Sequence, residues 1–142
     1  METFHYMLMV TQAEFQRKVL ELTAKEGLLP GQPKILDFLK DHDGCEQKDI
    51  ANGCRLDPAT VTGLLNRMET AGLVTRNQKD GNRRSYQILM TSKGKKLQKK
   101  TDEIFEKCEA LALNNITDKE RELYMKLMYQ IYENLQKGDK TK

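Results

Sequence analysis

The chain has 142 residues, of which 38% are hydrophobic and 32% charged, with a formal net charge of +3 at pH 7. This length supports one domain with an adequate core, and no long apolar run or secretory signal pattern is present, so we expect a cytoplasmic protein without membrane contact. The three cysteines, Cys45, Cys54 and Cys108, are odd in number and lack paired spacing, which argues against a disulfide framework.

The N-terminal segment is predicted to be helical. Residues 2–25 carry apolar side chains at helical spacing, and a cluster of glycine, leucine and proline that breaks the helix follows at residues 27–31. A second helix is expected from Gln32 or Pro33 to about residue 40, and a turn at residues 41–44 ends it. Apolar residues cover so much of the circumference of the first helix that more than one neighbouring element must pack against it.

Two short helices in the middle of the chain have the pattern of a helix-turn-helix. The first is expected over residues 46–51. The second begins after Asp57, whose carboxylate suits the capping position, and Pro58 suits the first helical position because its missing donor is not needed there. The residues that recur at helical spacing, and so predict its buried side, are Val61, Leu64, Leu65 and Met68.

The opposite side of this second helix holds the candidate residues for reading a major groove. They are Ala59, Thr60, Thr62, Gly63, Asn66 and Arg67. Threonine and glycine lower helix stability, whereas an ordinary solvated face is rich in lysine and glutamate. Small polar side chains near a helix N-terminus let the backbone approach base edges, and Arg67 would then pair with guanine and Asn66 with adenine. An exposed face without any special purpose is the alternative.

A β-hairpin is predicted directly after the helix-turn-helix. Strands are expected at residues 73–77 and 85–90, and Asp80-Gly81 between them is the strongest hairpin signal in the chain. The candidate DNA-binding residues of the hairpin are Lys79, Asn82, Arg83 and Arg84. We expect the paired arginines to enter a minor groove, because narrow A·T tracts attract guanidinium groups. Together these elements predict a winged helix over residues 31–100.

The positive charge is concentrated in the same region. Residues 55–100 contain 11 Lys and Arg against 3 Asp and Glu, hence +8, while the two flanks sum to −5. Such a concentration is expected of a surface that binds phosphates. A winged-helix protein-interaction module without DNA readout is the alternative, and it would not need this charge.

Two long helices are predicted after the hairpin. Thr91 is expected to cap a helix to about residue 113, and Thr117 with Glu120 forms a capping box for a last helix to about residue 136. Long amphipathic helices at both ends of so short a chain need a partner for their apolar faces. Residues 2–25 and 104–136 are therefore predicted to build a symmetric homodimer, whose two recognition helices lie about one helical turn of DNA apart.

These residues resemble the MarR family of multiple-antibiotic-resistance-type transcription regulators. The resemblance lies in Ile50-Ala51, the run from Leu56 to Thr62, Leu64 to Glu69, Gly72-Leu73-Val74, Arg83-Arg84, and Leu89 to Gly94. It implies a mainly α fold, a winged helix-turn-helix with a three-helix core and a β-hairpin wing, flanked by long N- and C-terminal dimerisation helices. It also implies a homodimer that binds a pseudo-palindromic operator in double-stranded DNA, usually as a repressor.

This chain departs from the family pattern at two positions. Asn82 stands where members usually have an aspartate that braces the arginine matched by Arg84, so the negative charge is missing. Glu46 stands where the family has serine or threonine at the start of the short helix, and an acid there still suits the helix dipole.

The resemblance also implies regulation by a small molecule. Relatives often release DNA when a small phenolic, aromatic or lipophilic effector enters the crevice between dimer helices and winged helix. Met7, Met9 and Phe15 are the candidate lining residues, although a methionine stripe is more often plain core.

A redox- or metal-sensing regulator of the same fold is the remaining alternative. Cys54 and Cys108 read as small buried hydrophobes, and Cys45, expected in a turn, is the plausible exposed thiol. His42 and Cys45 provide two ligands where a tetrahedral zinc site needs four, so no metal and no cofactor is predicted. No nucleophile elbow, phosphate-binding glycine loop or metalloprotease helix is present, which predicts no catalytic residues and no enzyme.

Overall fold

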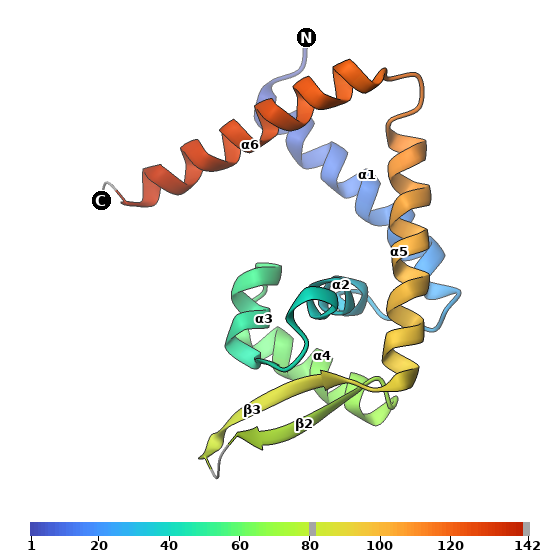
Figure 1. The fold of residues 1–142 in the computed structure, drawn as a ribbon. Coiled ribbons are helices and arrows are strands. Elements are labelled where there is room, and N and C mark those ends of the chain that lie inside the picture. Colours follow the sequence, from blue (N-terminus) through green and yellow to red (C-terminus); the bar gives the residue numbers. More distant parts are fainter. Residues whose placement is uncertain (80–81, 141–142) are drawn as a thin grey trace. The chain divides into compact units, whose positions relative to one another are not determined.

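The computed structural model describes residues 1–79 and 82–140, apart from the side chains of residues 79, 82–84 and 139–140. The chain divides into two compact units, Met1–Cys108 and Glu109–Lys142, and α5 passes from one into the other. The elements in chain order (Figure 1) are α1 (Phe4–Ala24), α2 (Gln32–His42), β1 (Cys45–Glu46), α3 (Gln47–Cys54), α4 (Pro58–Thr70), β2 (Val74–Lys79), β3 (Asn82–Met90), α5 (Ser92–Ala112) and α6 (Asp118–Lys140).

The core of the first unit lies among α2, α3, α4 and the strands. Its fully buried side chains include Ile35, Leu36, Leu39, Ile50, Val61, Leu65, Met68 and Ile88. Burial of each side chain of this size contributes about 1.5–3 kcal/mol to the free energy of unfolding. The predicted buried side of α4 is therefore confirmed, and it fixes that helix against α3 and the sheet while its opposite side remains exposed.

The helix starts follow the predicted capping residues. The Asp57 carboxylate accepts a hydrogen bond of 2.9 Å from the backbone N–H of Thr60 at the start of α4. At the start of α6, Thr117 and Glu120 exchange the two bonds of a capping box, at 3.0 and 3.2 Å. Side chains thus satisfy helix N–H groups that have no partner within the helix.

The strands form a small antiparallel sheet in the order β1-β3-β2. The predicted hairpin of β2 and β3 is confirmed, but β1 was not expected. Cys45 pairs with Ile88, so the turn expected at this cysteine is wrong, and α3 begins one residue later than predicted. A two-residue strand has no periodicity of its own, and β1 exists because a distant strand offers it hydrogen bonds.

Thr91 joins the hairpin to α5. Its hydroxyl lies 2.6 Å from the carbonyl oxygen of Gly72 and accepts a 3.0 Å hydrogen bond from the N–H of Gly94, which confirms it as the cap. A Cβ atom at Gly94 would lie 2.1 Å from the carbonyl oxygen of Leu73. Only glycine allows this approach, so the start of α5 is packed directly against the entry to the hairpin.

Large apolar side chains remain exposed on α1 and α6. On α1 they are Phe4, Tyr6, Met7, Leu8 and Met9. On α6 they are Leu123, Tyr124, Met125, Leu127, Met128, Tyr129, Tyr132 and Leu135, and of the side chains described there only Ile131 is half-buried. Uncovered apolar helix faces of this extent are typical of surfaces that bind another protein chain. In the part of the chain that the structure describes, no helix is both long and apolar enough to cross a membrane.

Candidate nucleic-acid interface

The side of α4 predicted to read DNA is exposed along its whole length. All six candidates on this helix, Ala59, Thr60, Thr62, Gly63, Asn66 and Arg67, are exposed. A Cβ atom built on Gly63 meets no atom within 4 Å, so the chain itself leaves this space open. Towards the end of the helix, Asn66 and Arg67 border an open hollow of about 310 Å³. The structure thus brings the six residues together on one accessible surface.

The hydroxyl of Thr60 is engaged by the helix cap. It donates to the second carboxylate oxygen of Asp57 at 2.6 Å, while the backbone N–H of the same threonine binds the first. These two hydrogen bonds stabilise the charged carboxylate and lower the pKa of Asp57. Thr60 therefore presents its methyl group and the lone pairs of its oxygen to the outside, because its only hydroxyl proton points to the cap.

Thr62 is held from three directions. Its hydroxyl donates to the backbone carbonyl of Pro58 at 3.0 Å and accepts from the amide nitrogen of Gln47 on α3. Its backbone carbonyl accepts a long hydrogen bond, 3.4 Å, from Nη2 of Arg76 on β2. This residue of the recognition helix is thus bonded both to the other helix of the helix-turn-helix and to the hairpin.

Gln47 and Arg76 are functional candidates that the sequence did not identify. The signal for Arg76 was available, because side chains alternate along a strand and Arg76 shares the face of the buried Val74. The Nε atom of Arg76 is buried and has no hydrogen-bond partner among the described residues. Gln47 lies at the first position of α3, and no local pattern reveals that its side chain reaches a residue on the next helix.

The predicted residues of the wing fall at the tip of the hairpin. Lys79 pairs with Asn82 across β2 and β3, and Arg83 and Arg84 follow on β3. The side chains of these four residues lie outside the described part of the chain, so their contact with a minor groove stays a prediction.

Two lysines of the basic segment are bound within the chain. Lys93 donates to the backbone carbonyl of Ala71 at 2.8 Å, near the end of α4. Lys100 lies 3.4 Å from the carboxylate of Glu26. Such pairs are exposed and contribute little stability. They do show that part of the +8 charge is already engaged before any phosphate arrives.

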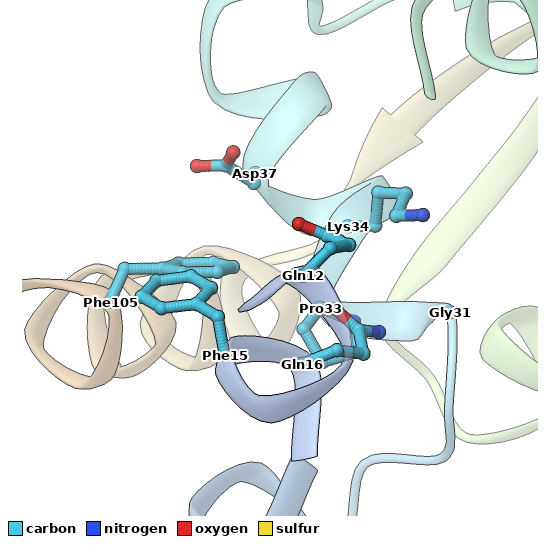
Figure 2. A pocket seen from close by; sticks show the side chains of 8 residues that line it. All are labelled: Gln12, Phe15, Gln16, Gly31, Pro33, Lys34, Asp37 and Phe105. Carbon is cyan, nitrogen blue, oxygen red and sulfur yellow. The ribbon is translucent and has the colours of Figure 1, made fainter. Parts of the chain in front are cut away.

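A second cavity lies among α1, α2 and α5, within the first unit. Its volume is about 220 Å³, and it is lined by Gln12, Phe15, Gln16, Gly31, Pro33, Lys34, Asp37 and Phe105. Figure 2 shows the rings of Phe15 and Phe105 together, with Lys34 and Asp37 of α2 also lining the cavity. Of the three predicted effector-pocket residues, only Phe15 lines this cavity, while Met7 and Met9 are exposed on the first turns of α1.

The thiols are poorly suited to sensing oxidants. Cys54 and Cys108 are buried, whereas Cys45 is half-buried in β1. Burial raises the pKa of all three, that of Cys45 to about 11 with a further contribution from Asp49, so the reactive thiolate is scarce at neutral pH.

His42 has other contacts than a metal. Its ring stacks on Phe38 with centroids 4.1 Å apart, and its Nδ1 lies 3.0 Å from the carbonyl oxygen of the same residue. Over residues 1–79 and 82–140, no three His, Cys, Asp or Glu side chains are grouped as metal ligands would be.

The supported helix pair, the exposed polar side of α4 and the adjoining hairpin define the chain as a winged helix-turn-helix protein. The MarR family model matches residues 28–86. The transcriptional repressor YetL of Bacillus subtilis is 31% identical over 116 residues, which cover 79% of this chain and 68% of the relative. The chain belongs to the MarR family of transcription regulators.

Two solved structures share the fold. The S. aureus MepR–DNA complex has a TM-score of 0.85 at 23% identity and matches 94% of this chain and 99% of that one. A MarR-family regulator from Listeria monocytogenes, complexed with a 26mer DNA, has a TM-score of 0.87 at 20% identity and matches 95% of this chain and 90% of its own. The fold class expected from the sequence is therefore confirmed.

Proposed function

We propose that this chain is a homodimeric repressor that binds a pseudo-palindromic operator in double-stranded DNA. The exposed side of α4 would enter the major groove, and Arg84, with Arg83, the adjacent minor groove. Ala59, Thr60, Thr62 and Gly63 would allow close approach of the helix, and Asn66 and Arg67 would contact base edges. A specific base contact of this kind discriminates by about 1–3 kcal/mol.

One observation carries this proposal above the others. The side of α4 that faces away from the core carries mainly small residues, with the long Arg67 towards its end, and its central Gly63 has open space around it. A helix of this composition loses stability relative to one built from alanine, lysine and glutamate. Its surface matches the shape and polarity of a groove far better than it matches an apolar protein surface.

The test is selection of DNA from a random duplex pool, followed by affinity measurements at several salt concentrations. We expect a two-fold-related consensus whose half-sites lie about one helical turn apart, and a steep loss of affinity with rising salt. Absence of DNA binding at low salt would contradict the proposal and favour a protein-interaction module. Arg67→Ala should weaken binding to the consensus more than binding to unrelated DNA.

The dimer is proposed to use residues 2–25 and 104–136. Exposed apolar side chains gather on α1 and α6, and covering them is what a second copy of the chain would provide. Light scattering at micromolar concentration should give twice the mass of the 16.4 kDa chain. A monomer would contradict this arrangement, and the spacing of half-sites would then need another explanation.

We also propose that a small aromatic or lipophilic effector binds in the cavity beside Phe15. The cavity of about 220 Å³ accommodates a single ring, and Lys34 and Asp37 supply polar groups at its edge. Phenol at millimolar concentration is the first probe, with release of the selected operator as the measurement. If Phe15→Ala responds to phenol like the unaltered protein, this cavity is not the site.

We propose a cytoplasmic location, where operator DNA is accessible, and no enzymatic role. The named relatives include a repressor from Bacillus subtilis, and the residues singled out on α4 and the wing serve contact rather than bond making.

A further inference from the structure

We propose that Gln47 determines which base the recognition helix prefers opposite Thr62, by fixing the Thr62 hydroxyl as a hydrogen-bond acceptor. This inference rests on the proposed function, since it concerns the same face of α4. It goes further in assigning a specificity role to a residue on the other helix of the pair, outside the six candidates on α4.

The Thr62 hydroxyl can form only a limited number of hydrogen bonds, and two of them are already made within the chain. A hydroxyl has one proton and two lone pairs. The proton is directed to the carbonyl oxygen of Pro58, 3.0 Å away and one turn earlier in α4. One lone pair accepts from the side-chain amide nitrogen of Gln47. What remains for an outside partner is one lone pair, together with the methyl group of an exposed side chain.

The side chain of Gln47 keeps the proton of the Thr62 hydroxyl directed to Pro58. Without Gln47 the hydroxyl could rotate and offer its proton outward, since a threonine hydroxyl turns to suit its surroundings. Gln47 comes from α3, which is anchored by the fully buried Ile50, so its reach towards Thr62 is set by the packing of the two helices. On the other side of the same residue, Arg76 holds the backbone carbonyl of Thr62 from β2. Thr62 is thus oriented before DNA arrives.

A hydroxyl that only accepts hydrogen bonds distinguishes between base edges. In the major groove the edge of guanine presents only acceptors, whereas adenine and cytosine each present an amino group that donates. An acceptor-only hydroxyl binds the amino group of adenine or cytosine and repels the oxygen of guanine. We therefore expect one position in each half-site to prefer adenine or cytosine over guanine by about 3- to 10-fold, the value of one hydrogen bond.

The experiment compares base preferences selected from a random duplex pool by the unaltered protein and by Gln47→Met. Methionine keeps the length and helix propensity of glutamine but donates no hydrogen bond. We expect Gln47→Met to lose the preference against guanine at one position per half-site and to keep the remaining consensus and the salt dependence. Thr62→Val, which removes the hydroxyl and keeps the shape, should lose the preference at the same position, and the double variant should lose nothing more.

Thr70→Val is the matched control. Thr70 lies on the same helix, and its hydroxyl also bonds to a carbonyl one turn earlier, that of Asn66, at 3.0 Å. It should keep every base preference. An unchanged preference in Gln47→Met, or an equal loss at all positions, would overturn the inference while leaving DNA binding established. If Gln47→Met fails to fold, an unchanged preference in Thr62→Val overturns it equally, and failure of the unaltered protein to bind any DNA removes the proposed function as well.

Discussion

Helices α4 and α6 both expose a full face, but the two faces differ in chemistry. On α4 the candidate DNA-reading side chains are mostly short, with the long Arg67 towards the end, and a stripe of buried residues on the opposite side holds the helix in the core. On α6 many large apolar side chains are exposed beside charged ones such as Lys126, and the described part of that helix has no fully buried residue. The first face suits a hydrated polar groove, and the second suits another apolar surface.

Exposure of a helix face alone therefore does not define its function. Gly63 of α4 weakens its helix and has open space in front of it, a cost that the proposed contact with DNA would explain. Leu127 and Tyr124 of α6 are 52% and 51% exposed, a cost that burial in an assembly would remove.

The largest effect is expected on α6. Leu127→Glu should raise the dissociation constant of the homodimer by about 1000-fold, because about 2 kcal/mol of apolar burial is lost in each of two copies. Size-exclusion chromatography with light scattering measures this as a shift to the monomer mass. Lys126→Glu introduces the same side chain at the adjacent exposed position and should remain dimeric. Equal masses for the two variants would show that the apolar face of α6 is not the interface.

The next effect concerns the wing, which accompanies α4. Arg84→Ala should lower operator affinity by about 10-fold and reduce the slope of affinity against salt by about one ion. The physical reason is the loss of one guanidinium from a narrow, negative groove. Titration of labelled operator at several salt concentrations gives both values. Unchanged affinity and slope would remove the wing from DNA recognition, and Lys119→Ala on α6 provides the control for a charge lost elsewhere.

Substitution of Gly63 is expected to have two smaller effects of opposite sign, one on folding stability and one on operator affinity. Gly63→Ala should raise the free energy of unfolding by about 0.5–1 kcal/mol, because alanine favours the helix and the added methyl meets no atom of the chain. The same methyl occupies the space through which α4 approaches the bases, so operator binding should weaken several-fold. Thermal melts and operator titrations provide the two measurements. A gain in stability with unchanged binding would mean that this part of α4 is an ordinary exposed face.

The smallest effect is expected at Cys45. Because burial raises the pKa of this thiol from about 9 to about 11, the thiolate fraction at pH 7 to 8 is small and should grow about tenfold per pH unit until pH 11. Alkylation by iodoacetamide, followed by mass spectrometry, should follow that rise in pH. Mild peroxide at pH 7 should leave operator binding unchanged, and a rapid loss of binding would restore the redox-sensing alternative.

The features of α4 were predictable from the sequence because they are local. Its cap Asp57, its first proline and its buried stripe all lie within one helix, and helical periodicity assigns both faces at once. The hairpin was predicted from equally local patterns, the alternation in its strands and Asp80-Gly81 between them, and these two residues lie outside the described part of the chain.

What escaped prediction depends on contacts between distant segments. Strand β1 exists only through its pairing with Ile88 and Gln87. The proposed role of Gln47 likewise depends on its hydrogen bond to Thr62, 15 residues later in the chain. The amphipathic helices α1 and α6 were predicted, as was a second copy of the chain to cover their apolar faces. Arg76 is an intermediate case, because strand alternation gives its direction but not the helix that it reaches.

The junction at Thr91 has a mechanical consequence for regulation. Since Gly94 presses against the backbone of Leu73, the first turns of α5 cannot slide or swivel independently of the strand that precedes the tip of the hairpin. The stretch of α5 from Ser92 to Cys108 therefore connects the base of the wing with Phe105, which lines the cavity beside Phe15. Under the proposed function, an effector bound there would contact the same helix whose first turn is packed against the entry to the hairpin, which gives effector binding a continuous structural route to the wing.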